Sequence, residues 1–386
     1  MASTLAWLLA TPVALLTAVF AIEVLSGLKP GRRRGRTLSK ARFVIVVPAH
    51  NEAEGIERTV TGLRAAAEGV ARVLVIADNC EDGTAALASR AGAEVVERRD
   101  PSRRGKGYAL AHARDHLASD PPDVLAVLDA DCQLDRASLQ ALFAGAQEGP
   151  AQAINLLAPD MTAGAMVQVS NFAFLVKNLI RQRGLLRLSG RVNLTGTGMA
   201  MPWPLFRDAL LATDDLVEDL GLGLDLAAGG HRAALIEEAT VWSPASTGGG
   251  TLKQRTRWEG GFLSTSRRRA APAIAAALRH GSATDLWAGL SLAVPPLALL
   301  VMTDIVVAFM TASLLVLGGS PVPLALVLAS LAAALIALLL AWWSYGRPFL
   351  SGRAALKLPL YLVWKLPLYL KLIRGKPDSW VRTDRR

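Results

Sequence analysis

"DVLAVLDADCQ", residues 123–133, is an apolar run that ends in two aspartates, Asp129 and Asp131, with one alanine between them. A short apolar run in front of polar residues is typical of a buried β-strand. Because side chains on a strand alternate between its two faces, the two carboxylates point the same way and can converge on one cation or ligand. The pair alone also fits a strand end that happens to be acidic, so the surrounding sequence has to decide between the two interpretations.

The preceding segments repeat the same arrangement of an apolar strand, a polar loop and a helix. Strands that alternate with helices predict an α/β fold with a mainly parallel sheet. In such sheets ligands bind at the carboxyl ends of the strands, which here read "PAHNE", "ADNCEDGT" and "DADCQ". The aspartates therefore lie where a ligand is expected. The strands are predicted within 42–52, 72–84, 93–100 and 123–133, and the helices within 55–68, 85–92 and 106–118.

The composition indicates that part of the chain lies in a membrane. Of the 386 residues, 52% are hydrophobic, which is high for a wholly soluble protein. The 42 Lys and Arg exceed the 32 Asp and Glu, and the net charge of +10 suits either nucleic acid or an anionic membrane face. Because the basic clusters stand beside apolar segments, we expect membrane lipid and no nucleic acid as a partner.

Three segments have the length and apolar character of membrane spans: Leu5–Leu25, one within Leu286–Leu317, and Val322–Trp343. Arginines stand at one end of each span, at 32–36 and at 267–269 for the first two. By the positive-inside rule, the N-terminus is then outside, and the long middle segment and the C-terminus are cytoplasmic. This pattern predicts a multi-pass protein of the inner (cytoplasmic) membrane.

Two further features belong to this membrane part. Asp304 lies inside the second span, where an ionisable group is costly enough to indicate either a functional residue or one that faces another helix or water. "KLPLYLVWKLPLYLKLI", residues 357–373, carries lysines that disfavour a crossing and prolines that should interrupt a straight helix, so it is expected to lie in the interface. The predicted division is 1–30 anchor, 40–266 α/β domain, 267–285 interfacial linker, 286–345 transmembrane hairpin and 346–386 basic interfacial segment.

Other site classes are disfavoured by the sequence. No G-x-G-x-x-G follows the first strand, and "RRGKGY" lacks the remaining residues of a phosphate-binding P-loop. Cys80 and Cys132 are far apart in sequence and indicate neither a disulfide framework nor a zinc cluster.

Seven motifs occur in a fixed order along the middle segment: "VIVVPAHNE", "VIADNCEDGT", "RGKGYAL", "DADCQ", "GTGMA", "VED" and "QRTRW". In this order they resemble the membrane-bound branch of family 2 glycosyltransferases, which includes cellulose, hyaluronan and poly-N-acetylglucosamine synthases and ceramide glucosyltransferase. The resemblance implies a GT-A fold, Rossmann-like with a mixed, mainly parallel sheet, joined to transmembrane helices. Two departures are visible, because the family's "DDGS" reads "ADNC" and its "TED" reads "VED".

The resemblance implies a donor site at the strand ends. Breaking a nucleotide-sugar bond needs the charge of the departing diphosphate to be neutralised, which a hard divalent cation held by carboxylate oxygens does well. Asp131 would bind Mg²⁺ or Mn²⁺, Asp129 would lie near the metal or the ribose, and Lys106 would add positive charge. The residues implied to surround the nucleoside base are Pro48, His50, Glu52 and Asp78.

The resemblance makes Asp219 the base that accepts the proton of the acceptor hydroxyl, with Glu218 orienting the acceptor. One displacement with one base predicts inversion at the anomeric carbon. Taken alone, "VED" also fits the first turn of a helix, where carboxylates are favoured by the helix dipole.

In "QRTRW", Gln254, Arg257 and Trp258 share one face if the segment is helical. Arginine suits a diphosphate through its planar fork, and tryptophan offers a flat surface for a sugar ring or a lipid-linked acceptor. The alternative is an amphipathic helix beside the membrane with a tryptophan at the interface.

The sequence thus predicts an inverting, metal-dependent hexosyl- or N-acetylhexosaminyltransferase at the cytoplasmic membrane face. Its donor would be a nucleotide-sugar, with a UDP-sugar favoured, and its acceptor a lipid-linked or growing saccharide. A processive exopolysaccharide synthase stays open as an alternative, and with only three spans it would need an oligomer or an export partner. A catalytically silent membrane assembly subunit is the alternative from another class.

Overall fold

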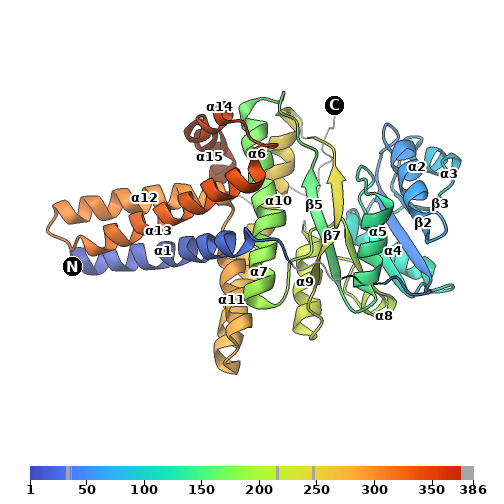
Figure 1. Ribbon diagram of the computed structural model, residues 1–386, viewed down its shortest axis with the longest axis horizontal. Helices are drawn as coiled ribbons and strands as arrows, with labels where there is room; N and C mark the ends of the chain where they lie inside the picture. The colour runs from blue at the N-terminus through green and yellow to red at the C-terminus, as the bar shows by residue number, and fades with distance from the viewer. Residues whose placement is uncertain (32–34, 36, 214–216, 246–247, 375–386) are drawn as a thin grey trace.

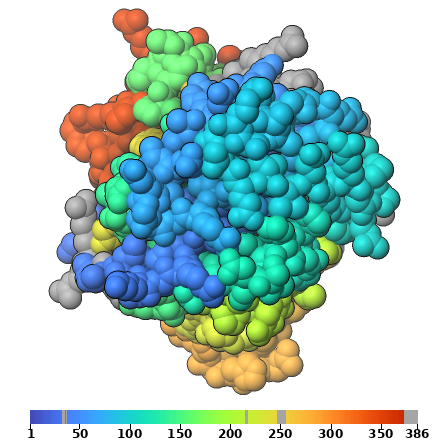
Figure 2. Space-filling view, turned by 90° about the vertical axis from the view of Figure 1, so that its right-hand side faces the viewer, coloured from blue at the N-terminus to red at the C-terminus, as the bar shows by residue number. Residues whose placement is uncertain are grey.

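The computed structural model describes residues 1–386 except 32–34, 36, 214–216, 246–247 and 375–386, and it describes only the backbone of 248–254 and 373–374. Figure 1 shows a group of long helices side by side at one end of the molecule, a twisted sheet with its covering helices at the other, and a layer of helices crossing between them. Figure 2 shows the face turned away from the long helices, which is covered mainly by residues of the first half of the chain.

The sheet has seven strands in the order β3-β2-β1-β4-β6-β5-β7. The first four strands in this order are parallel, and β6 is antiparallel to both of its neighbours, β4 and β5. The predicted mixed, mainly parallel sheet is therefore confirmed. The strands are β1 Phe43–Ala49, β2 Ala71–Asp78, β3 Glu94–Arg98, β4 Val124–Val127, β5 Ala151–Leu157, β6 Met199–Pro202 and β7 Ala234–Ser243.

Helices cover both faces of this sheet because the side chains of its inner strands are buried on both sides. In β1, Ile45 and Val47 pack in the core under two helices, whereas Val44 and Val46 pack in the core on the opposite face. The covering helices are α2 Ile56–Ala67, α3 Thr84–Arg90, α4 Lys106–Leu117, α5 Arg136–Ala146 and α9 Glu218–Ala228, and α8 Trp203–Arg207 follows β6.

A second layer of helices lies between the sheet and the three long helices (Figure 1). One of its members runs from α6 through a single π-helical turn, η1, into α7. Helix α10 continues through residue 266, where the α/β segment was expected to end. The elements of this layer are α6 Ala165–Leu175, η1 Val176–Ile180, α7 Arg181–Ser189, α10 Gly248–His280 and α11 Ala283–Ala293.

Three helices of the described part are long and apolar enough to span a membrane: α1 Ala2–Gly27, α12 Leu297–Val316, and α13 Val322–Ala341, which continues through the π-helix η2 Trp342–Gly346. They coincide with the three predicted spans. Asp304 of α12 is buried and accepts a hydrogen bond from Thr17 of α1 at 2.9 Å, so it faces a neighbouring helix.

The last helices of the described part of the chain are α14 Gly352–Ala355 and α15 Leu358–Arg374. Pro367 lies inside α15, so the helix continues through this proline. Pro359 is the second residue of the helix, where no backbone N–H has to be donated within the helix.

Helix α1 is fixed to the α/β part of the chain by a close crossing with η1 and α7. A Cβ atom on Gly184 would lie 2.0 Å from the carbonyl oxygen of Glu23, and one on Gly27 would lie 1.8 Å from that of Ile180. Next to this crossing, the buried Glu23 carboxylate pairs with Arg181 at 2.7 Å and accepts a hydrogen bond from Trp287. Only glycine therefore allows the two backbones to approach this closely.

Replacing Gly184 by alanine is expected to lower the free energy of unfolding by about 1–3 kcal/mol, because the helices must separate to admit one methyl group. Thermal unfolding of the detergent-solubilised chain measures this loss. Gly62→Ala is the matched control, since open space surrounds Gly62 in α2 and alanine should stabilise that helix by about 0.5–1 kcal/mol. Equal effects of the two substitutions would contradict the close crossing.

Candidate active site

The loops that follow β1 and β2 are locked together at the carboxyl edge of the sheet. His50 Nδ1 lies 2.7 Å from the carbonyl oxygen of Asp78, and the Cys80 thiol is 3.4 Å from the N–H of Asn51, which donates to it. Asn51 and Asn79 adopt left-handed backbone conformations with φ of 53° and 52°, which asparagine tolerates better than most residues. The serine-like position of Cys80 thus ties two loops together.

Asp78 is held by an arginine that the sequence did not single out. Arg98 at the end of β3 pairs with the Asp78 carboxylate at 2.6 Å, and both side chains are about nine-tenths buried. Burial raises the pKa of Asp78, and the guanidinium of Arg98 opposes that rise. Asp78 and Arg98 are direct neighbours in the parallel pairing of β2 with β3, a register that the separate segments did not reveal.

Two carboxylates and a thiol form a cluster after β4. Ligand atoms of Asp129, Asp131 and Cys132 all lie within 4.8 Å of one another. Burial, together with the charges of the two aspartates, raises the pKa of the Cys132 thiol well above its ordinary value, so it stays protonated at neutral pH. Two carboxylates with a protonated thiol fit a hard cation bound through oxygen better than a soft metal bound by thiolate.

Lys106, the first residue of α4, reaches into this cluster. Its ammonium pairs with the Asp129 carboxylate and donates to the carbonyl oxygen of Gly196 at 2.6 Å. Burial alone would lower the pKa of Lys106, but the charges of Asp129, Glu218 and Asp219 outweigh it and raise the pKa to about 12. Lys106 is therefore a permanent positive charge at the centre of the site.

Gly196 brings the "GTGMA" and "VED" segments together. A Cβ atom on Gly196 would lie 3.1 Å from Asp219 Oδ2 and 3.5 Å from Lys106 Nζ, and the residue has a φ of 79°. A side chain there would be strained and would crowd both charged groups, so glycine is required. Lys106 thus contacts both Asp129 and Gly196, and the predicted base, Asp219, lies beside the same glycine.

Glu218 and Asp219 occupy the first turn of α9, so the helix-start interpretation of "VED" also holds. Burial raises the pKa of Asp219, and Lys106 opposes the rise. Burial and the neighbouring Asp219 charge raise the pKa of Glu218 to about 7. Burial thus raises the pKa of both adjacent carboxyl groups, and the negative charge of Asp219 adds to the rise at Glu218.

The raised pKa of Glu218 makes stability depend on pH. The folded state has a pKa of about 7 where the ordinary value is 4.5, so it binds the proton more tightly and the free energy of unfolding falls as the pH rises between those values. Glu218→Gln removes this penalty and is expected to stabilise the protein more at about pH 8 than at about pH 5, by on the order of 2 kcal/mol. Unfolding in detergent at both pH values tests this, and a gain independent of pH would contradict it.

The described part of "QRTRW" lies on α10 against α6. The Trp258 ring is 5.7 Å from that of Phe174, and the Arg255 guanidinium stands over both rings at 5.2 and 4.9 Å. Arg255 is buried and donates to Ser170 Oγ at 2.9 Å. Arg257 is partly exposed, and the side chain of Gln254 lies outside the described residues.

Arg255 and Lys177 were not predicted as site residues. Lys177 lies on the π-helical turn between α6 and α7, and its charge acts on Asp219. Helical periodicity could have indicated Arg255, which precedes Trp258 by three positions and is therefore its neighbour on the surface of a helix. No sequence pattern indicates that α6 contributes to the site, because its position beside α10 depends on tertiary packing.

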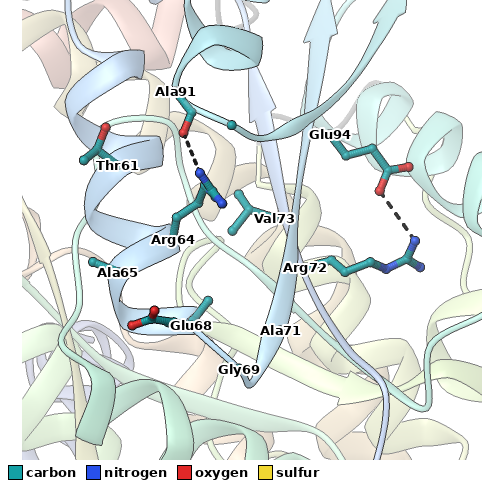
Figure 3. Close-up of a pocket in the computed structure, with 12 residues that line it drawn as sticks. Thr61, Arg64, Ala65, Glu68, Gly69, Ala71, Arg72, Val73, Ala91 and Glu94 are labelled. Carbon is teal, nitrogen blue, oxygen red and sulfur yellow. Dashed lines mark hydrogen bonds and ion pairs between the residues drawn. The ribbon is translucent and has the colours of Figure 1, made fainter.

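A cavity of about 610 Å³ lies at the other edge of the sheet, between α2 and the start of β2. Figure 3 shows Arg64, which donates to Ala91, and Arg72, which pairs with Glu94, in its wall. None of the predicted site residues whose side chains are described lines it. This open cavity is thus separate from the carboxyl edge.

A mixed GT-A-like sheet with an aspartate pair, a lysine and an acidic helix start at its carboxyl edge defines a nucleotide-sugar glycosyltransferase associated with a membrane. The chain belongs to glycosyltransferase family 2, because the family described as "Glycosyltransferase like family 2" matches residues 41–261.

Individual relatives agree with this assignment. The chain is 32% identical over 230 residues to the glycosyltransferase AglJ of Haloferax volcanii, covering 58% of this chain and 71% of AglJ. It is 34% identical over 105 residues to an uncharacterized glycosyltransferase of Mycobacterium tuberculosis, covering 27% of this chain and 44% of that one. Among solved structures, the mannosyltransferase PcManGT from Pyrobaculum calidifontis, in complex with GDP-Man and Mn²⁺, shares the fold with a TM-score of 0.56 at 17% identity, covering 97% of this chain and 99% of that one.

Proposed function

We propose that this protein is an inverting, divalent-metal-dependent glycosyltransferase that moves a hexose or N-acetylhexosamine from a nucleotide-sugar to a lipid-linked acceptor at the cytoplasmic face of the membrane. The observation that carries the proposal is that Lys106 pairs with Asp129 and contacts Gly196, beside which Asp219 lies. The ammonium of Lys106, a positive charge for the donor phosphates, and the carboxylate of Asp219, which would accept the acceptor proton, therefore lie in one place.

The donor would bind along the carboxyl edge of the sheet. Pro48, His50, Glu52 and Asp78 lie at or just after the ends of β1 and β2, where they can surround the nucleoside base. Asp131, with Asp129, would hold Mg²⁺ or Mn²⁺. The metal, when bound, neutralises the negative charge of the diphosphate.

The transfer step would use Asp219 as the base. Its carboxylate accepts the proton of the acceptor hydroxyl while that oxygen forms a bond to the anomeric carbon and the bond from this carbon to the nucleoside diphosphate breaks. The positive charge of Lys106 opposes the rise that burial causes in the pKa of Asp219, which favours the ionised form of the base. Glu218, protonated below about pH 7, can donate a hydrogen bond that orients the acceptor.

Helix α10 would contribute residues that bind the diphosphate and the sugar or acceptor. Gln254 and Arg257 are proposed to bind the diphosphate, since a guanidinium matches phosphate oxygens in pairs. Trp258 is proposed to present its ring to the sugar or to the apolar part of the acceptor. Support comes from its packing against Phe174, which fixes the ring in the helix layer next to the membrane spans.

The experiment has to identify both the nucleotide and the sugar of the donor. A UDP-sugar is favoured, and GDP-mannose must be included because the mannosyltransferase of the same fold was solved with it. Release of nucleoside diphosphate is measured from a panel of UDP- and GDP-sugars by the full chain in phospholipid vesicles supplied with lipid extract, with Mn²⁺, with Mg²⁺ or with chelator. Metal-dependent turnover of one donor and an inverted linkage in the product are expected. Binding of a donor without turnover across all extracts would favour the silent-subunit alternative.

A further inference from the structure

One lysine of the C-terminal helix α15 points into the protein. Lys365 is 0% exposed, whereas Lys357, just before the helix, is exposed. Lys365 Nζ donates to Glu259 Oε1 at 2.5 Å, and the Tyr369 hydroxyl, one turn later, donates to Glu259 Oε2 at 2.7 Å. Both oxygens of one carboxylate are therefore occupied by α15.

Glu259 is the residue directly after "QRTRW", four positions after Arg255 on α10. Residues with this spacing are neighbours on a helix, and an arginine and a glutamate placed so attract each other. In the structure, the Arg255 guanidinium is instead directed to α6, where it donates to Ser170 and stands over the rings of Phe174 and Trp258. The electrostatic influence of Glu259 still reaches Arg255.

Removing Lys365 or Tyr369, the two partners of Glu259, would change which groups Arg255 contacts. A carboxylate in a partly buried place has to be paired, and leaving it unpaired is strongly unfavourable. The Arg255 guanidinium is on the adjacent turn of the same helix and can turn toward Glu259 to satisfy it. It would then leave the two rings, and Trp258 would lose the cation that stacks on it.

We propose that Lys365 and Tyr369 are positioning residues of the transferase: by occupying the Glu259 carboxylate, they keep Arg255 stacked on Phe174 and Trp258 and so hold Trp258 in place. This inference rests on the proposed function, in which Trp258 contacts the acceptor or the sugar. The outer side of α15 exposes Leu360, Val363 and Leu366, so the same helix that holds Glu259 also presents an apolar face for the membrane interface.

The test uses the full chain in phospholipid vesicles and two measurements. The first is hydrogen–deuterium exchange of peptides covering residues 255–266, which needs no substrate. The second is steady-state release of nucleoside diphosphate with the donor, metal and lipid extract that support wild-type turnover. Lys357→Met is the matched control for Lys365→Met, because it removes the same charge from an exposed position near the start of α15.

Lys365→Met is expected to increase exchange in residues 255–266 and to lower kcat about tenfold, with the donor KM within about twofold of wild type, because small displacements of a positioned group lower the rate. Tyr369→Phe keeps the charged pair and should lower kcat less. The decisive variant is Lys365→Met combined with Glu259→Gln. A neutral amide does not attract Arg255, so the double variant should recover most of the lost turnover and exchange protection.

Four results would overturn the proposal: unchanged exchange and kcat in Lys365→Met, a double variant as impaired as the single one, a donor KM that rises as kcat falls, or an equal effect of Lys357→Met. If Lys365→Met does not fold, the double variant and Tyr369→Phe carry both measurements, and wild-type values in Tyr369→Phe would then count against the proposal. If wild type releases no nucleoside diphosphate from any donor, the proposed function fails, while the exchange measurement still decides whether α15 holds Arg255 through Glu259.

Discussion

Asp219→Asn is expected to lower kcat by about 10²–10⁴-fold while leaving the donor KM within about twofold of wild type, because a base contributes to the transition state and little to donor binding. The amide keeps the size of the carboxylate but cannot accept the acceptor proton at neutral pH. Its neighbour Lys106 also loses a charged partner, although it keeps Asp129 and the carbonyl oxygen of Gly196. Steady-state release of nucleoside diphosphate in vesicles measures both constants.

Asp225→Asn is the matched control for this substitution. Asp225 lies on the same helix α9, is exposed and pairs with Arg269 at 2.6 Å. Removing that surface charge should leave kcat near wild type, because exposed pairs contribute about 0–1 kcal/mol to stability. If Asp219→Asn retained a large part of wild-type turnover, another group would have to accept the proton.

Asp131→Asn is expected to lower turnover by about 10²–10³-fold at low metal concentration, because the metal contributes several kcal/mol of charge stabilisation. Asp129 remains, so raising the Mn²⁺ concentration should restore part of the activity. Wild-type protein should lose turnover with a chelator and regain it when Mg²⁺ or Mn²⁺ is added. Titrating metal against turnover gives the concentration for half activation, which should rise in the variant.

Cys132→Ser tests whether the thiol takes part in metal binding together with the two neighbouring carboxylates. The buried thiol lies 3.2 Å from the Ser243 hydroxyl and stays protonated. A serine of similar shape should leave the metal concentration for half activation unchanged. A shift as large as that of Asp131→Asn would mean that sulfur takes part in metal binding, and wild-type turnover in the presence of chelator would remove the metal from the mechanism.

The elements with strong local patterns could be predicted from the sequence. The apolar runs that became β1, β2 and β4 have clear lengths and polar ends, and the three spans have clear hydropathy, so both the parallel part of the sheet and the membrane helices were confirmed. Strand β6 was not expected between β4 and β5, because its four apolar residues carry no sign of direction or partner. Strand order is decided by packing of distant segments.

The same distinction between local sequence patterns and contacts of distant segments applies to the site. Lys106, Asp129 and Asp219 belong to ordered motifs, and the structure brings them together, while their chemical roles stay predictions. The sequence does not distinguish Lys365 from the other lysines of its segment, because its inward orientation depends on Glu259, which lies 106 residues earlier in the chain. Charged residues buried by one distant partner leave no periodic trace in the sequence.

The crossing of α1 with α7 has a practical consequence for anyone preparing the enzyme. Phe20 and Val24 of α1 belong to the same buried cluster as Val44 and Val46 of β1. A chain shortened to begin at residue 40 would leave Arg181 without the Glu23 carboxylate and open an apolar surface beside Gly184. Such a fragment would aggregate rather than dissolve, so the enzyme has to be purified with its first helix attached, in detergent or lipid from the first step.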